Sequence, residues 1–292
     1  MCGITGWVNF ERDISDQREI LTRMNQQHEK RGPDAKGTWL SPHVLLGHRR
    51  LSVIDLESGM QPMVRQYGDR QYVITYNGEL YNMPELRQEL TKRGYSFTST
   101  SDTELILAAY AEWREDCPRY LNGIFAFAIW DEQRQQLYFA RDRIGVKPFF
   151  YWRQGDDFLF GSEIKSLLAH PQVEPVLDEQ GIAEVLLIGP ARTPGIGIFR
   201  GIYECRPGHC GWINRDGLQI KPYWELKSDH HRDDFQTTVE RVRELFTDAV
   251  RRQLVSDVPI GTMLSGGLDS SAISACAAQV FAEEGRGPLP TY

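Results

Sequence analysis

The 292-residue sequence lacks the features that mark membrane, secreted and nucleic-acid-binding proteins. No apolar run approaches the about 20 residues that a membrane helix needs. A secretory signal is not expected, because Glu11, Arg12 and Asp13 interrupt the apolar stretch at the N-terminus. The formal net charge of −7 leaves no general basic face for nucleic acid. We therefore expect a cytoplasmic protein that binds neither membranes nor nucleic acid.

Cysteine is scarce, and the five cysteines are an odd number with no repeating spacing. This pattern argues against a disulfide framework and predicts free thiols in a reducing compartment. Cys205, His209 and Cys210 lie close together in "CRPGHC", but no second pair of ligands accompanies them. We therefore expect no metal site in this chain.

One cysteine has an unusual position, because Cys2 becomes the N-terminal residue once Met1 is removed. In the simplest interpretation, Cys2 is an ordinary small hydrophobic residue. In the second, its α-amine is a base of nearly matched strength, since the pKa is about 8.5 for a thiol and about 7.7–8.0 for such an amine. An N-terminal amine of this kind activates a nucleophile, here with a water relaying the proton. Sequence position alone leaves both interpretations open.

The segments before residue 227 mix strand and helix patterns without a regular alternation. This mixture predicts an α+β fold in which sheets pack together with helices outside. The predicted helices cover 17–30, 83–94 and 103–113. The predicted strands cover 3–10, 37–40, 43–56, 71–80, 123–131 and 136–152, with fragments at 209–213 and 218–224. Residues 157–170 are expected to turn from a strand into a helix.

The pattern changes after a polar stretch at 227–234, which we interpret as a linker between domain 1–226 and domain 235–292. Apolar residues at helical spacing predict an amphipathic helix over 235–255. A strand at 258–264, a loop at 265–271 and a helix at 272–284 are expected to follow. This order is the opening βα unit of a different, α/β domain.

Six ordered pieces of the first 151 residues resemble the class II glutamine amidotransferases, the N-terminal-nucleophile glutaminases. They are "MCGI" at the start, "RGPD" (31–34), "HRRLSVIDL" (48–56), "YNGELYN" (76–82), "SDTE" (101–104) and "RDRIGVKPFFY" (141–151). The resemblance runs through about residue 225 and implies a four-layer αββα sandwich. It also implies that Cys2 attacks glutamine and that this step needs no cofactor.

The matched positions carry groups that suit glutamine. Arg50 suits the α-carboxylate through a two-pronged hydrogen bond, and Asp102 and Glu79 suit the α-ammonium. Asn77 and Gly78 suit an oxyanion hole through a side-chain amide and a backbone N–H. The resemblance further implies contacts from Leu51, Ser52, Val53 and Ile54.

Each of these residues also has a structural interpretation that the sequence alone leaves open. Arg50 is an ordinary solvated strand charge in that interpretation, and "NG" is typical of a hairpin turn. Ser101 and Glu104 have the spacing of a capping box, which would place Asp102 in the first turn of a helix. The capping role and the binding role of this segment are compatible.

The string "SGGLDSS" (265–271) predicts a phosphate-binding loop. Two glycines between an apolar strand and a helix let backbone N–H groups approach phosphates, although a plain βα turn gives the same pattern. The lysine of a Walker A loop is absent. The string resembles the pyrophosphate loop of enzymes that adenylate a carboxylate with ATP. The resemblance implies an ATP site formed by Leu264, Ser265, Gly266, Gly267, Asp269 and Ser270.

A glutaminase followed by an adenylating domain resembles the glutamine-hydrolysing asparagine synthetases. That family implies a ligase that uses glutamine, aspartate and ATP with Mg²⁺, and that forms β-aspartyl-AMP before asparagine, AMP and pyrophosphate. Because the chain ends at Tyr292, soon after the loop, we expect a fragment that retains only the glutaminase half. The alternatives are a related amidotransferase with another carboxylate acceptor and a non-catalytic fragment. The sequence does not decide between a monomer and a homodimer.

Overall fold

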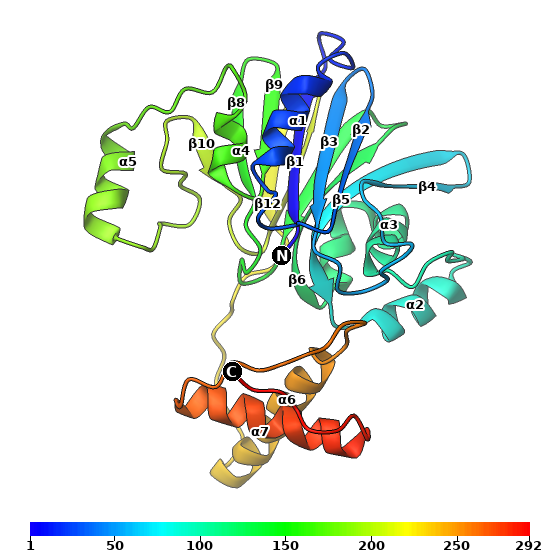
Figure 1. The fold of residues 1–292 in the computed structure, drawn as a ribbon, viewed down its shortest axis with the longest axis vertical. Coiled ribbons are helices and arrows are strands. Elements are labelled where there is room, and N and C mark those ends of the chain that lie inside the picture. Colours follow the sequence, from blue (N-terminus) through cyan, green and yellow to red (C-terminus); the bar gives the residue numbers. More distant parts are fainter. The chain divides into compact units, whose positions relative to one another are not determined.

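Two six-stranded antiparallel sheets form the body of residues Met1–Glu225, the first of two units into which the chain divides (Figure 1). The computed structural model describes residues 1–292. The strand order is β10-β8-β9-β1-β3-β2 in one sheet and β12-β11-β7-β6-β5-β4 in the other. No helix combines the length and the apolar character that crossing a membrane requires.

The first sheet carries the chain's N-terminal strand near its centre. Its strands are β1 (Gly3–Asn9), β2 (Ala35–Leu40), β3 (Val44–Arg50), β8 (Phe150–Gln154), β9 (Asp157–Gly161) and β10 (Ile202–Glu204). The second sheet consists of β4 (Met63–Tyr67), β5 (Arg70–Leu80), β6 (Gly123–Asp131), β7 (Gln136–Arg141), β11 (His209–Asn214) and β12 (Gly217–Pro222). Central strands such as β1 and β7 are buried along their whole length, whereas the edge strand β2 alternates between exposed and half-buried residues.

Three apolar clusters separate four layers. Between the sheets, Ile4 and Phe160 of the first sheet meet Trp130 and Phe139 of the second. The outer face of the first sheet is covered by α1 (Arg18–Gln26) and α4 (Ile164–Leu168). The outer face of the second is covered by α2 (Met83–Lys92) and α3 (Asp102–Trp113). The predicted αββα sandwich is therefore confirmed.

Two predicted strands of this sandwich are shorter than expected. The pattern over 43–56 becomes a strand only as far as Arg50, and the chain then forms a loop. The pattern over 136–152 is interrupted at 142–149, where the buried Asp142 carboxylate accepts backbone N–H bonds from Ile144, Val146 and Lys147. Local side-chain acceptors such as this one compete with the strand ladder for backbone donors.

Several elements of the same unit were not predicted. They are strands β4 and β10, the 3₁₀ helix η1 (Arg114–Tyr120), helix α5 (Glu179–Ala183) and the π-helix η2 (Glu184–Ile188).

The predicted capping box at the start of α3 is wrong in one half. Ser101 caps the helix, because its Oγ accepts from the Thr103 N–H at 3.2 Å. The Glu104 carboxylate does not return to Ser101 but accepts from Thr98, Ser99 and the guanidinium of Arg65. These partners hold the pKa of Glu104 at about 2, against the opposing effect of burial.

The second unit, Leu226–Tyr292, contains two helices, α6 (Phe235–Arg252) and α7 (Leu268–Glu283). They pack through a small cluster that includes Val250, Leu254 and Phe281. The predicted strand at 258–264 is not present. Only Thr262 pairs, in a single parallel bridge to Thr291, because a strand needs extended neighbours on its edges and this unit supplies one short segment.

The stacked aromatic rings between the sheets are expected to contribute strongly to stability. Phe149 is fully buried between Phe139 and Phe160, with ring centroids 4.9 and 5.3 Å apart. Phe149→Ala should lower the free energy of unfolding by about 3–5 kcal/mol in urea denaturation, because a cavity replaces these contacts. Ile144→Ala, in the same loop with a side chain 72% exposed, is the control and should change it by less than about 0.5 kcal/mol. Equal losses in the two variants would contradict this packing.

Candidate active site

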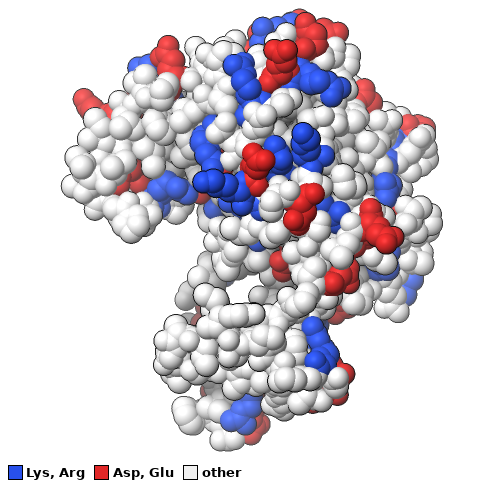
Figure 2. All heavy atoms as spheres, viewed as in Figure 1, with Lys and Arg blue, Asp and Glu red and all other residues white.

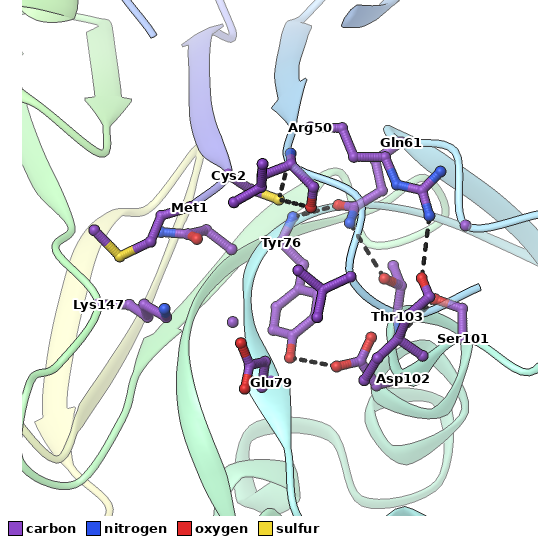
Figure 3. A pocket seen from close by; sticks show the side chains of 16 residues that line it. Met1, Cys2, Arg50, Gln61, Tyr76, Glu79, Ser101, Asp102, Thr103 and Lys147 are labelled. Carbon is purple, nitrogen blue, oxygen red and sulfur yellow. Dashed lines mark hydrogen bonds between the residues drawn. The ribbon is translucent and has the colours of Figure 1, made fainter. Parts of the chain in front are cut away.

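One pocket of the first unit collects side chains from the starts of β1 and α3, the end of β3, the following loop and β5 (Figure 3). It encloses about 590 Å³, including the part that opens to solvent. Its lining consists of Met1, Cys2, Arg50, Leu51, Val53, Ile54, Gly59, Gln61, Tyr76, Asn77, Gly78, Glu79, Ser101, Asp102, Thr103 and Lys147. Of the residues predicted to contact glutamine, only Ser52 is missing from this lining.

The thiol of Cys2 lies at the beginning of β1, inside the pocket. Its Sγ accepts a hydrogen bond from the Leu51 N–H at 3.4 Å and lies 3.5 Å from the Leu51 carbonyl. Arg31 fixes the backbone of Met1 and Cys2. The Arg31 Nε donates a hydrogen bond to the Cys2 carbonyl at 3.0 Å, and the Arg31 carbonyl accepts one from the Met1 amine at 3.1 Å. Burial raises the pKa of the Cys2 thiol and lowers that of the N-terminal amine. Both groups are therefore pushed toward their neutral forms.

Arg50 braces the loop that follows β3. Its Nη1 donates to the carbonyl of Leu56 at 3.1 Å, and its Nη2 donates to the carbonyls of Ile54 and Asp55. A Cβ at Gly59 would collide with this guanidinium, so glycine is required where the loop passes it. Arg50 is buried rather than the solvated strand charge of the structural interpretation.

The same loop is fastened at two further points. The Asp55 carboxylate accepts from the backbone N–H and hydroxyl groups of Ser58 and Thr100, which ties the loop to the segment before α3. The Ser52 N–H donates to Asp34 at 2.7 Å.

Asn77 and Gly78 lie within β5, where they pair with Ala126 and Phe125 of β6. The hairpin-turn interpretation of "NG" is therefore wrong. Asn77 is 1% exposed, and its side-chain Nδ2 has no hydrogen-bond partner. A buried donor without a partner costs about 1–3 kcal/mol, and because Asn77 lines the pocket, its amide is a candidate donor for a ligand bound there.

The opposite side of the pocket is acidic. Asp102 Oδ2 accepts from the Tyr76 hydroxyl at 2.8 Å and from the Leu80 N–H at 3.2 Å (Figure 3). Burial nevertheless raises the pKa of Asp102 to about 6, and the nearby Glu79 carboxylate contributes to the rise. A cationic group entering this side would be paired with two carboxylates.

Several lining residues were not predicted from the sequence. Two of them, Gln61 and Lys147, make contacts that shape the pocket or set its charge. Gln61 joins two walls, because its Oε1 accepts from the Tyr76 N–H at 2.6 Å and its Nε2 donates to the Thr103 hydroxyl at 3.2 Å. Lys147 is buried and faces Glu79 (Figure 3), and burial lowers its pKa. Lys147 lies within the motif "RDRIGVKPFFY" and was identifiable there, whereas no sequence signal marks Gln61.

The residues predicted to bind ATP lie together in the second unit, on the loop before α7 and its first turn. Gly266 has a φ of 83° and open space where a side chain would stand. The hydroxyls of Ser265 and Ser270 are 3.0 Å apart, and the Ser271 N–H bonds back to the Gly267 carbonyl. Leu264 and Asp269 are exposed beside them. No group of three or more His, Cys, Asp or Glu side chains is arranged to hold a metal ion.

Comparison with protein families assigns the two units separately. The family described as "Glutamine amidotransferase domain" matches residues 1–224, and the family described as "Asparagine synthase" matches residues 241–292. Among curated proteins, asparagine synthetase [glutamine-hydrolyzing] 3 of Bacillus subtilis is 56% identical over all of this chain and 48% of its own length. The amidase chry2 of Gibberella zeae is 36% identical over 94% of this chain and 42% of its own length. The chain thus spans about half the length of these relatives.

Among solved structures, the glutamine phosphoribosylpyrophosphate amidotransferase of B. subtilis shares the fold. The match has a TM-score of 0.54 at 16% identity and covers 100% of this chain and 65% of that one.

The raised pKa of Asp102 generates a prediction about stability. The folded chain binds this proton more tightly than the unfolded chain, so between pH 3.8 and about 6 the ionised carboxyl increasingly opposes folding. Asp102→Asn keeps an oxygen for Tyr76 and Leu80 but carries no charge. Its free energy of unfolding relative to the parent should therefore rise from pH 4 to pH 7 by up to about 3 kcal/mol. Urea denaturation at both pH values measures this, and a pH-independent difference would contradict it.

Proposed function

The chain belongs to the family of glutamine amidotransferase domains, and on this premise we propose that residues 1–224 hydrolyse glutamine to glutamate and ammonia with Cys2 as nucleophile. The observation that carries the proposal is the buried, unpartnered amide of Asn77 in the same pocket as the Cys2 thiol. A donor left unpaired in the resting site gains its partner only when negative charge forms there, which is how an oxyanion hole accelerates a reaction.

The charges of the pocket support glutamine as the substrate. Asp102 and Glu79 would pair with its α-ammonium, and Arg50 with the backbone of Leu51–Ile54 would hold its α-carboxylate end. The side-chain amide of glutamine then extends toward Cys2. The guanidinium of Arg50 already donates to three loop carbonyls, so its contribution includes shaping the loop that receives the carboxylate.

The reaction proceeds after removal of Met1. The Cys2 thiol gives its proton to the Cys2 α-amine, and the sulfur forms a bond to the amide carbon. Asn77 Nδ2 and the Gly78 N–H stabilise the resulting oxyanion. The carbon–nitrogen bond then breaks, the amine returns the proton to the leaving nitrogen, and ammonia departs. Water attacks the thioester to release glutamate and regenerate the thiol.

The pKa shift of the Cys2 thiol suits this first step. Burial raises the pKa of the thiol, so the thiol keeps its proton until the substrate is attacked.

We further propose that the second unit, beginning after a linker at 227–234, is the start of an ATP-binding domain. The open loop at 265–270 would take the phosphates of ATP through backbone N–H groups at the start of α7. One acid, Asp269, lies in the first turn of that helix. A lone carboxylate suits Mg²⁺ that arrives bound to phosphates, since Mg²⁺ is commonly held by one or two carboxylates plus substrate oxygens.

For the whole protein we propose glutamine-dependent synthesis of asparagine from aspartate and ATP through β-aspartyl-AMP, in the cytoplasm. The support is the 56% identity to a B. subtilis asparagine synthetase and the five free cysteines. Amidation of another carboxylate is the second candidate, because the amidase chry2 of Gibberella zeae also matches 94% of this chain.

Cys2→Ala tests the nucleophile. Glutamate release from glutamine should be lost, because no other pocket residue supplies a thiol. Cys276→Ala, which removes another partly exposed thiol, should leave it unchanged. A diazoketone analogue of glutamine should add its mass once, at residue 2, as read by peptide mass spectrometry. Full activity in protein that retains Met1 would overturn this mechanism.

Asn77→Ala tests the oxyanion hole separately from binding. We expect kcat to fall by about 10²–10³ with little change in KM, because the donor acts chiefly in the transition state. Asn214→Ala, at the end of β11 and outside the pocket, is the matched control. A rise in KM alone would show that Asn77 binds the substrate and does not stabilise the oxyanion.

A further inference from the structure

A second hollow lies on the outer face of the first sheet, between α1 and the edge strand β2. It encloses about 670 Å³, including its open side, and is lined by Arg18, Thr22, Asn25, Gln26, Lys36, Gly37, Thr38 and Arg49. Three of these side chains are cations from three different elements, and none of the lining residues is acidic. Arg49 faces away from the glutaminase pocket, because consecutive residues of a strand point to opposite faces and Arg50 lines that pocket.

The three cations have no partners within the protein. Neither Arg18 nor Lys36 nor Arg49 makes an ion pair or a side-chain hydrogen bond, although most other arginines of the chain do. Arg49 Nε is buried without an acceptor. Lys36 and Arg49 stand directly opposite each other on β2 and β3, an arrangement in which like charges destabilise a sheet. Arg18 and Lys36 are exposed and Arg49 is half-buried, so three unpaired cations surround one hollow that is open to solvent.

Nearby acids do not neutralise it. Glu19 lines a neighbouring hollow on α1 together with Arg18 and a further cation, Arg23, and forms an ion pair with neither. Asp34, two residues before Lys36, accepts the Ser52 N–H. Figure 2 shows Lys and Arg side chains gathered on the face of the first unit that carries α1 and its neighbouring strands, with acidic side chains among them.

One residue that lines the hollow, Asn25, narrows the kind of anion. Asn25 donates its Nδ2 to the carbonyls of His48 and Gly37 at 3.2 and 3.4 Å, which fixes the orientation of its amide. Its Oδ1 is buried and has no partner. A ligand that satisfies both Arg49 and Asn25 must carry acceptor oxygens and also a donor. Hydrogen phosphate and phosphate monoesters in their monoanionic form have both, whereas sulfate and chloride have no donor.

We propose that this hollow is a binding site for a phosphate-type oxyanion, free or as the phosphate group of a small molecule. Arg49 and Arg18 would supply planar donors, Lys36 a point charge, and Asn25 the acceptor for the phosphate hydroxyl. The site faces away from the glutaminase pocket, and binding there does not depend on the proposed function.

The test uses inorganic phosphate with the 1–292 chain and follows thermal unfolding at constant ionic strength. Phosphate should raise Tm in a saturable way, sulfate less, and chloride not at all. Lys36→Met and Arg49→Gln should each weaken the apparent phosphate affinity at least tenfold. Lys30→Met, which removes an exposed lysine outside the hollow, should leave the affinity unchanged.

Two further measurements test the proposal, the melting order of Lys36→Met with and without phosphate and the phosphate response of Gly266→Val. Without phosphate, Lys36→Met should melt higher than the parent, because it removes the like-charge pair; with saturating phosphate the order should reverse. Gly266→Val, which disturbs the loop proposed to bind ATP, must keep the phosphate response. The proposal is overturned if all variants respond alike, if chloride reproduces the effect, or if the response is lost in Gly266→Val alone.

Discussion

The pairing of β1 on both of its edges is the constraint on which the active site depends. Chain termini ordinarily fray, yet here the strand that begins one residue after Cys2 is bonded to β3 on one side and β9 on the other. Gly3 and Gly6 make this possible, because a Cβ at either would collide with His28 or Phe160. Cys2, the proposed nucleophile, is therefore attached directly to a strand that is fixed in the sandwich core.

The pocket built around this terminus combines polar groups that a core would normally exclude. Arg50 and Asp102 are buried, and each is held by backbone or hydroxyl partners. Asn77 is the exception, a buried donor left open. Groups of this kind oppose folding and are retained where a site needs preorganised charge. The stacked aromatic rings between the two sheets stabilise the fold and so offset the cost of burying these polar groups.

The sequence predicted those parts of the molecule whose structure depends on residues close together in the chain. Six motif fragments and the position of Cys2 pointed to residues that line one pocket, namely Cys2, Arg50 and the "NG" pair, and amphipathic periodicity located α6. Three features depended on tertiary context instead. Ser52 turned toward Asp34, Glu104 found Thr98 and Arg65 rather than Ser101, and residues 258–264 lacked neighbours with which to form a sheet. Gln61 entered the pocket through contacts with residues distant in sequence.

The place of Asn77–Gly78 inside β5 also bears on how the protein ages. Asn-Gly is the dipeptide most prone to spontaneous deamidation, in which the glycine nitrogen attacks the asparagine amide carbon and closes a succinimide ring. That attack requires the backbone to rotate out of an extended conformation. Here β6 holds both residues in register, and the backbone of Gly78 is packed so closely that an added Cβ would collide with Ile124 and Tyr76. The fold thus protects an amide whose deamidation would place a carboxylate in the pocket that holds Cys2.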